Sequence, residues 1–191
     1  MKLPEHVASA MALLETAGYP TYAVGGCVRD ALLGRTPNDW DITTDARPQE
    51  IKKIFRKTID TGIEHGTVTV LMNGSGYEVT TYRVDGDYSD HRRPDSVTFT
   101  DNLIEDLKRR DFTINAMAYN HERGIVDEFG GQEDLKTGIV RCVGTPNERF
   151  TEDALRILRA IRFSAQLGFE IEEATQNEIG PHAPDLPAVS A

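Results

Sequence analysis

The sequence predicts an α+β fold, in which helices and strands alternate up to about residue 145 and only helices follow. Two segments rich in β-branched and aromatic residues, 67–71 and 77–82, flank Asn73-Gly74-Ser75-Gly76, an arrangement typical of a β-hairpin. From Glu148 onward the pattern changes to that of an amphipathic helix. The apolar residues that take its i, i+3, i+4, i+7 spacing are Ala154, Ile157, Leu158 and Ile161.

This change of pattern predicts a domain boundary near 141–147, at Gly144-Thr145-Pro146. It divides the chain into a first domain over 1–143 and a helical domain over 144–191. The helical part is too small to hold a good core alone, and its proline-rich end, 181–187, cannot complete a packed helical layer. We therefore expect the chain to be a piece of a longer protein.

Periodicity and the positions of glycine and proline predict the remaining elements. Helices are expected at 4–17, 27–33, 47–55, 103–109 and 113–117, and further strands at 22–24, 39–42, near 126 and at 139–140. Residues 84–95 are polar, contain Gly86 and Pro94, and predict a mobile loop.

Composition narrows the class of protein. The chain has 191 residues, of which 39% are hydrophobic and 27% charged, which is typical of a globular protein. No stretch approaches the roughly 20 apolar residues of a membrane helix, and the N-terminus does not resemble a signal peptide. Neither Cys27 nor Cys142 has a Cys-X-X-Cys partner, so we expect no disulfide framework and a cytoplasmic location.

The charge is uneven along the chain. The net charge is −10, which argues against a general nucleic-acid coat protein. Residues 163–191 contain no Lys or Arg but five acids, so half of the net charge lies there. The remaining residues are close to balance, which leaves room for a local basic site.

The first chemical signal is the pair Asp39 and Asp41. In a strand, residues i and i+2 point to the same face, so the two carboxylates would lie side by side and repel. A bound divalent cation relieves this repulsion, and oxygen ligands favour Mg²⁺, which also binds substrate phosphates. Taken alone, such a pair is more often a solvated surface turn, so further residues must decide.

The second signal is Gly25-Gly26, between a predicted strand and a predicted helix. Glycines let a phosphate approach the backbone, and a helix N-terminus presents free N–H groups to it. Arg29, one turn into that helix, could clamp a phosphate oxygen. Glu78, on a neighbouring predicted strand, either completes a metal-binding triad with the two aspartates or is an ordinary outward-facing residue.

Gly25-Gly26-Cys27-Val28-Arg29-Asp30 followed by Asp39-Trp40-Asp41-Ile42 resembles the head domain of class II nucleotidyltransferases. These are the tRNA CCA-adding enzymes of bacteria and eukaryotes and the bacterial poly(A) polymerases, within the polymerase-β-like superfamily. Further motifs agree in order over about 15–180: a flexible loop at 85–94, a basic motif at 105–116, the end of the head at 127–131 and a neck helix at 152–162.

The resemblance implies a polymerase-β-like head, with a mixed or antiparallel sheet and flanking helices, followed by a helical neck. It implies transfer of a nucleoside monophosphate from CTP or ATP to a tRNA 3′ hydroxyl, with release of pyrophosphate. Asp39 and Asp41 would hold Mg²⁺, Glu78 would join them as a catalytic acid, and Arg29 and Arg110 would hold the triphosphate. Asp111, at the start of a predicted helix, has the character of a cap.

The predicted neck helix suggests how the base is chosen. Asp153 and Arg156 are three residues apart, about 60° around a helix, so they can act together. A carboxylate that accepts from an amino group beside a guanidinium that donates to a ring nitrogen fits cytosine and adenine and rejects uracil and guanine. Otherwise the two form a surface ion pair. Arg159 and Arg162 continue the spacing, but the four side chains cannot all face one base, so these two reach phosphate or RNA or solvate the helix; the resemblance implies that they bind nucleotide.

The branch of the family stays open. Thr61 to Val68 resembles the CCA-adding type and lacks the arginine-rich motif of the poly(A) polymerases. Full CCA addition, A-addition and poly(A) addition are the enzymatic alternatives, and a non-catalytic regulatory module that binds a nucleotide is the alternative from another class. Family members run to about twice this length, so we expect weakened binding of the tRNA 3′ end. No membrane or protein partner is evident.

Overall fold

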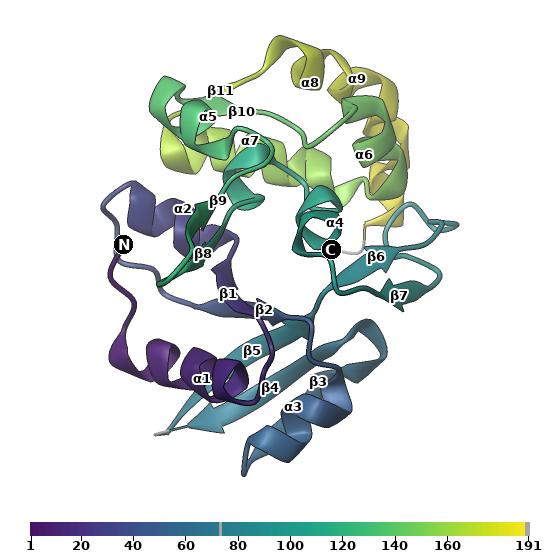
Figure 1. The fold of residues 1–191 in the computed structure, drawn as a ribbon. Helices are drawn as coiled ribbons and strands as arrows, with labels where there is room; N and C mark the ends of the chain where they lie inside the picture. The colour runs from purple at the N-terminus through teal and green to yellow at the C-terminus, as the bar shows by residue number, and fades with distance from the viewer. Residues whose placement is uncertain (73, 190–191) are drawn as a thin grey trace. The chain divides into compact units, whose positions relative to one another are not determined.

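The computed structural model describes residues 1–72 and 74–189, which form two compact units (Figure 1). The first unit comprises 1–84, 99–107 and 117–126, and the second comprises 85–98, 108–116 and the chain from 127 onward. Because the chain passes between the units more than once, neither unit is a continuous segment. The division into domains 1–143 and 144–191 remains a prediction.

A seven-stranded sheet forms the centre of the first unit, with the strand order β3-β4-β5-β2-β1-β8-β9. β2 pairs with β5 in parallel and the other neighbours are antiparallel, so the predicted mixed sheet is confirmed. Its strands are β1 (Thr21–Val24), β2 (Asp41–Thr44), β3 (Thr58–Gly62), β4 (Thr67–Met72), β5 (Ser75–Thr81), β8 (Ala118–Asn120) and β9 (Gly124–Val126). Asn73, in the predicted hairpin turn, lies outside the described residues.

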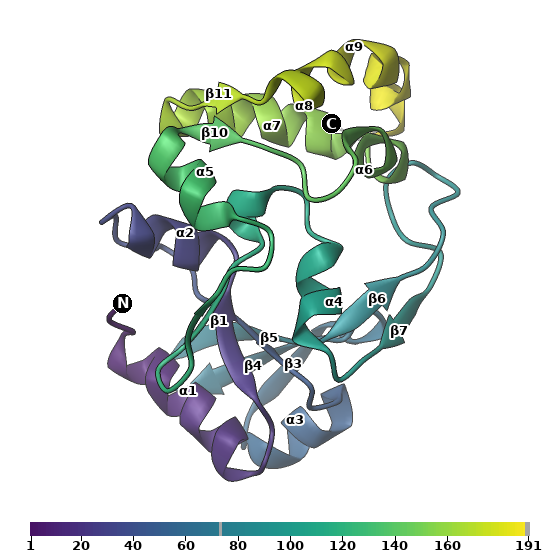
Figure 2. The ribbon, with the colours of Figure 1, turned by 45° about the horizontal axis from the view of Figure 1, so that its top comes forward.

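The helical elements of the first unit are α1 (Glu5–Thr16), α2 (Gly26–Leu32), α3 (Pro48–Ile54), the 3-10 turn η1 (Ile63–His65) and α4 (Leu103–Lys108). α1 and α3 lie on one face of the sheet, whereas α4 contacts the other face, where its Asp106 accepts a hydrogen bond from Thr43 of β2. α1 packs on β1, α3 packs on β4 and β5, and the two helices touch each other (Figure 2). The strand residues beneath them are buried because they alternate with residues of the opposite face: Ile42, Val68, Val70, Tyr77 and Val79.

The strand predicted over 39–42 is wrong by two residues, since β2 runs over Asp41–Thr44. Its antiparallel partner β1 ends at Val24, which pairs with Asp41. Gly25 then takes φ 81°, which turns the chain out of the strand. Asp39 therefore has no ladder partner on β1, and the two aspartates do not share a strand face.

The second unit contains helices and one very short sheet. β10 (Ile139–Val140) and β11 (Glu170–Ile171) pair in parallel, so the part predicted as helical also contributes a two-residue strand. β6 (Arg83–Asp85) and β7 (Val97–Phe99) form a separate two-stranded sheet, and each strand has residues assigned to both units. The helical elements are η2 (Thr113–Asn115), α5 (Gly131–Thr137), α6 (Pro146–Glu152), α7 (Leu155–Leu167), α8 (Glu173–Asn177), α9 (Ile179–His182) and η3 (Ala183–Ala188).

The structure also tests what the composition predicted about membrane helices and cysteines. Among the described residues, no helix combines the length and apolar character needed to cross a membrane. Cys27 and Cys142 are both buried free thiols. Burial raises the pKa of Cys27 to about 11 and that of Cys142 to about 12, so neither is a reactive thiolate at neutral pH.

Candidate functional site

A glycine turn ends β1 and begins α2. Gly25 has φ 81° and ψ −134°, a combination that side chains with a Cβ atom avoid. Its N–H donates to the carbonyl of Met117, and its carbonyl accepts from the N–H groups of Val28 and Arg29. Gly26 is the first residue of α2, and its place for a Cβ atom lies 3.5 Å from Nη2 of Arg29. The guanidinium of Arg29 thus folds back beside the turn, where its Nε donates to Asp30.

The turn predicts different outcomes for two alanine substitutions. Gly25→Ala should lower the free energy of unfolding by about 1–3 kcal/mol, because alanine is strained at this φ and ψ. Gly26→Ala is the matched control, since its Cβ atom meets Arg29 at an ordinary contact distance. Urea unfolding of the two variants measures the difference. Equal stability of the two would contradict the conformation described for Gly25.

Asp41, the second residue of the aspartate pair, lies on β2 across from the end of β1, next to this turn. Asp41 pairs with Val24, the residue before Gly25, and the sulfur of Cys27 lies 4.0 Å from the carbonyl oxygen of Asp41. Asp39 and Asp41 are exposed, and Trp40 between them is buried. The structure therefore brings together the two strongest signals of the sequence, although not by the strand geometry that the sequence suggested.

Glu78 joins them from β5. β2 and β5 run parallel and Val79 pairs with Ile42, so Glu78, one residue earlier, lies on β5 across from Asp41 on β2. Partial burial raises the pKa of Glu78, and the negative charges of Asp41 and Asp39 raise it further. Among the described residues, however, no three acidic, histidine or cysteine side chains form an assembled metal cluster. The three carboxylates are close enough to repel, and hard oxygen donors of this kind suit a divalent cation.

The repulsion predicts a pH-dependent effect of Glu78→Gln. A raised pKa in the folded state means that the contribution of this group to stability falls as pH rises through the raised value. Without divalent cations, Glu78→Gln should raise Tm by about 1–3 °C at pH 8 and by less at pH 5. Thermal unfolding in chelator at both pH values measures this. The control is Glu64→Gln in η1, and an identical pH profile of the two variants would refute the repulsion.

A buried carboxylate that the sequence analysis did not single out supports β2. Asp106 on α4 is fully buried, and its Oδ2 accepts from the hydroxyl of Thr43 at 3.3 Å while its Oδ1 accepts from the N–H of Arg83 at 3.2 Å. Thr43 also donates to the carbonyl of Thr80 on β5. Asp106 thus holds the strand that carries Asp41. Its place within the basic motif 105–116 was the available signal, but an Asp beside Glu105 on a short helix suggests a solvated position.

The second unit holds the predicted residues of the basic motif and the neck. Asp111 accepts from the N–H of Phe112 at 2.8 Å and from the amide of Asn115 at 3.2 Å. Its other oxygen accepts from Nε of Arg159 at 2.6 Å, and the Arg159 guanidinium also lies over the ring of Phe163. Asp111 is therefore structural, as predicted, and it fixes Arg159. Arg110 precedes it and is half-buried.

The neck is not one helix through Asp153. α6 ends at Glu152, α7 begins at Leu155, and Asp153 between them is extended with φ −142° and ψ 104°. Its Oδ1 accepts from the N–H of Leu155 at 2.9 Å, and its Oδ2 accepts from Arg92 at 3.2 Å. Burial raises the pKa of Asp153, against the lowering effect of these contacts. The prediction that Asp153 shares one helix with Arg156 is therefore wrong, since Asp153 precedes α7 and its carboxylate caps the start of that helix. Their joint role in reading the base stays a prediction.

Arg156 is buried and held by other partners. Its Nη1 donates to Glu152 at 2.6 Å and to the carbonyl of Arg149 at 3.3 Å, and its Nη2 donates to the carbonyl of Arg109 at 3.1 Å. These contacts fix the guanidinium next to the basic motif. Arg162, by contrast, is exposed, and its guanidinium carbon lies over the ring of Phe163, 5.2 Å from the ring centroid.

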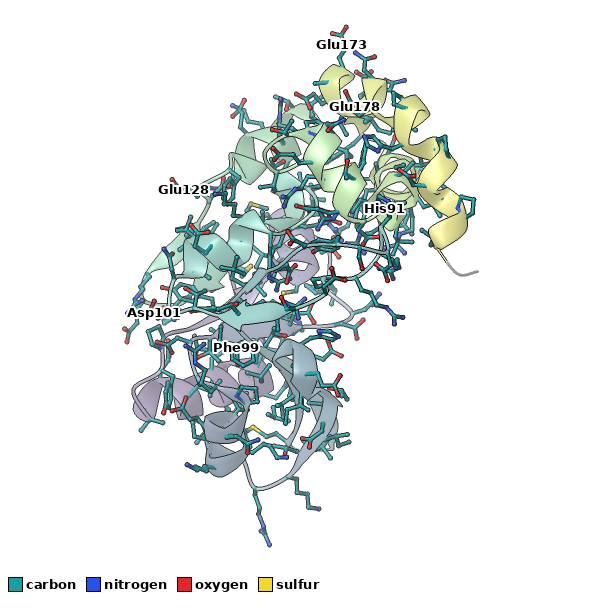
Figure 3. The ribbon with its side chains drawn as sticks, turned by 90° about the vertical axis from the view of Figure 1, so that its right-hand side faces the viewer. His91, Phe99, Asp101, Glu128, Glu173 and Glu178 are labelled. Atoms are coloured by element: carbon teal, nitrogen blue, oxygen red, sulfur yellow. The ribbon has the colours of Figure 1, made fainter. Side chains whose placement is uncertain are left out.

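The predicted loop contacts the junction of α6 and α7. His91, labelled in Figure 3, has the positive φ of 54°, which is unusual for a residue other than glycine. Its ring Nδ1 donates to the carbonyl of Thr151 at 2.8 Å, and its carbonyl accepts from the N–H of Ala154 at 2.9 Å. Together with Arg92, His91 brings the loop against the residues on both sides of Asp153.

Comparison with known proteins identifies the family. The model of the poly A polymerase head domain matches residues 21–141, which contain the glycine turn, Asp39, Asp41, Glu78 and Arg110. The chain belongs to the poly A polymerase head-domain family. The resemblance inferred from the sequence motifs is thereby confirmed, although Asp153 to Arg162 lie beyond the matched segment.

Relatives within this family are CCA-adding enzymes. The enzyme of Leuconostoc mesenteroides is 54% identical over 192 residues, which cover 99% of this chain and 48% of the relative. The enzyme of Lactobacillus helveticus is 58% identical over 181 residues, which cover 93% of this chain and 45% of the relative. The chain thus spans about half the length of the curated relatives it matches.

Solved structures agree. The Bacillus stearothermophilus CCA-adding enzyme in complex with CTP superimposes with a TM-score of 0.92 at 47% identity, over 100% of this chain and 46% of that one. The Thermotoga maritima CCA-adding enzyme complexed with tRNA has a TM-score of 0.77 at 30% identity, over 96% of this chain and 43% of that one. The fold of this family, with its mixed sheet and flanking helices, is therefore shown for the chain.

Proposed function

We propose that the chain carries the nucleotide-transfer site of a tRNA CCA-adding enzyme. It transfers CMP and AMP from CTP and ATP to the 3′ hydroxyl of tRNA, without a nucleic-acid template and with release of pyrophosphate. The observation that carries this proposal is the position of Asp41 directly across from the last residue before the Gly25 turn, with Glu78 beside it. The similarity to a CCA-adding enzyme crystallised with CTP supports it.

Asp39 and Asp41 are the residues that would hold a divalent cation, for which we propose Mg²⁺. Their exposed carboxylates, next to a third acid whose pKa is raised by their charge, fit such an ion. When bound, the ion supplies a lowered pKa for the attacking hydroxyl and a positive charge for the phosphates. Glu78 acts as the third acid, whose charge adds to the attraction of the site for the ion.

The phosphates of the nucleotide are bound by the glycine turn and by arginine. Gly25 and Gly26 allow a phosphate to approach the backbone where α2 begins, and the Arg29 guanidinium lies beside Gly26. Both groups can therefore bind the same phosphate. Arg110 is proposed to bind the triphosphate on the strength of the basic motif at 105–116 alone.

The base is read by Asp153 and Arg156 in the second unit. Asp153 accepts from the exocyclic amino group of cytosine or adenine, and Arg156 donates to the neighbouring ring nitrogen. The two residues are held by separate partners, Arg92 and Glu152, rather than by each other. Arg159, fixed by Asp111, and Arg162, which is exposed, contribute positive charge for phosphate or RNA. The reaction takes place in the cytoplasm, where uncharged tRNA is matured.

The test is a gel assay with tRNA that lacks its 3′ CCA, in the presence of Mg²⁺ and of CTP, ATP or both. Growth by three nucleotides only with both substrates is the expected result. One A added only to tRNA that already ends in CC would make the chain an A-adding enzyme, and a long A ladder would make it a poly(A) polymerase. Nucleotide binding without any extension of RNA would contradict the proposal and favour a regulatory binding module.

A further inference from the structure

The face of the sheet opposite α1 and α3 is polar; α4 lies on it at Thr43 of β2, and solvent reaches it along β3, β4 and the Glu78 end of β5. Alternation along each strand places Ile59 and Thr61 of β3, Thr67, Thr69 and Leu71 of β4, and Glu78 and Thr80 of β5 on this face. Their exposure agrees, because Ile59 is 50% and Leu71 38% exposed, whereas Val68, Val70 and Val79 between them are fully buried. Two exposed aliphatic side chains are ordinary on a protein surface, so the polar and charged groups around them must indicate what this face binds.

Threonine hydroxyls line the middle of this face. Thr61 and Thr69 share a hydrogen bond of 2.9 Å, and Thr67 and Thr80 share one of 3.0 Å. Gly76 lies beside them, and a Cβ atom there would come within 3.1 Å of the Thr69 methyl group and 3.4 Å of Leu71. The glycine therefore leaves Thr69 and Leu71 uncovered, with hydroxyl and apolar groups side by side.

The acids of the proposed site lie at one end of the same row. The register pairs Ile59 with Thr69 and Thr69 with Glu78, and β2 with Asp41 follows next to β5. Strands lie about 4.8 Å apart, so three spacings place Ile59 roughly 14 Å from Asp41. The open face thus leads from the edge strand β3 to the carboxylates.

Positive charge gathers at the outer end of this row. Residues 47–57 include five basic residues and one acid, in a chain with a net charge of −10. Lys52 pairs with Asp60 at 2.8 Å. Lys53, Arg56 and Lys57 are exposed, and no ion pair of theirs occurs among the described residues. A helix C-terminus attracts cations, which accounts for Lys52 and Lys53 but not for Arg56 and Lys57, which lie beyond the end of α3.

Lys57 forms a backbone hydrogen bond with a strand of the open face. Its carbonyl accepts from the N–H of Leu71 at 3.0 Å, so it borders the exposed Leu71 on the neighbouring strand. The alternation that places Ile59 and Thr61 on the open face extends to position 57. Lys57 and Arg56 therefore stand at the edge of the sheet where the row begins.

We propose that this face, defined by Lys57, Ile59, Thr69 and Leu71 and bordered by the exposed Arg56, is the track for the unpaired 3′-terminal strand of the acceptor RNA. The inference rests on the proposed function, because Asp41 marks where the 3′ hydroxyl must arrive. Arginine and lysine bind backbone phosphates, threonine hydroxyls bind phosphate or ribose, and the exposed aliphatic side chains contact base faces. A single strand matches this mixture of groups in a row that ends at the acids.

The test measures binding without catalysis. Fluorescence anisotropy follows a short 5′-labelled single-stranded RNA with a free 3′ hydroxyl, without nucleoside triphosphate, over a series of salt concentrations. Arg56→Ala and Lys57→Ala should each lower the slope of log affinity against log salt by about 0.7, the value for one phosphate contact on a single strand. Ile59→Asp should weaken binding about tenfold at the lowest salt concentration, which tests the face rather than its edge. Lys136→Ala is the control, since Lys136 is an exposed lysine of the second unit that pairs with Glu133.

The outcomes separate this proposal from the proposed function. Lower slopes for Arg56→Ala and Lys57→Ala, with Lys136→Ala unchanged, support the track even if the chain adds no nucleotide. Slopes equal to that of the unsubstituted chain overturn the track, even if CCA addition is normal. Failure of the unsubstituted chain to bind the RNA at low salt also overturns the track. If that chain still binds CTP, the proposed nucleotide site is unaffected by this result.

Discussion

Asp41→Asn should lower the rate of nucleotide addition by at least about 10³-fold and leave the fold intact. Asparagine has the shape of aspartate but carries no charge, so the pairing of residue 41 with Val24 is kept while a negative oxygen is lost. Because Asp41 and Glu78 repel each other, the substitution should also raise Tm slightly in the absence of divalent cations. Single-turnover extension of tRNA and thermal unfolding of the same preparations measure the two effects.

Glu133→Gln is the control for this experiment. Glu133 is exposed and forms an ion pair with Lys136 that is itself exposed, so its removal should change both rate and stability very little. A rate for Asp41→Asn within tenfold of that of the unsubstituted chain would contradict the role assigned to the carboxylate. A lowered Tm in chelator would contradict the repulsion between the carboxylates.

Arg156→Lys should reduce the preference for CTP and ATP over UTP and GTP by about 10- to 100-fold. The guanidinium of Arg156 is buried and donates at once to Glu152 and to two backbone carbonyls, those of Arg149 and Arg109. A lysine ammonium on a flexible stem cannot reproduce this planar set of donors. The ratio of kcat/KM for each nucleotide measures the discrimination, which a loss of stability alone would not change.

Arg141→Lys is the matched control. Arg141 also lies in the second unit and binds two carboxylates, Asp134 and Glu172, but has no assigned role in reading the base. Arg141→Lys should lower the stability of the chain and leave its preference for CTP and ATP over UTP and GTP unchanged. Unchanged discrimination in Arg156→Lys, or an equal loss in Arg141→Lys, would contradict the assignment.

Much of the fold followed from local patterns. β4 and β5 were evident because β-branched and aromatic residues alternate on both sides of a glycine-containing turn, and α1 because its apolar face is regular. β3 was missed because Thr58–Gly62 is an edge strand with three exposed residues and no apolar alternation. α6 was not predicted as a separate helix: only Phe150 of its seven residues is buried, and one helix was expected from Glu148 onward.

The site was predicted better in its residues than in its geometry. The glycine turn and the aspartates were recognised, but the end of β1 at Gly25 decides where β2 can begin, and this depends on pairing across the sheet. The break at Asp153 was hidden because the apolar spacing of α7 continues through Ala154. Only the capping contact with Leu155 and the approach of Arg92 from the loop reveal it. The role of Asp106 was not predicted, because its hydrogen-bond partners Thr43 and Arg83 are remote from it in sequence.

The most direct test of the central claim is release of pyrophosphate by this chain with each nucleoside triphosphate, in the presence of Mg²⁺ and an RNA with a free 3′ hydroxyl. We expect release of pyrophosphate with CTP and ATP, little release with UTP and GTP, and none from Asp41→Asn. Binding of CTP and ATP without release of pyrophosphate would contradict this claim, and the chain would then be a nucleotide-binding module rather than a catalytic one.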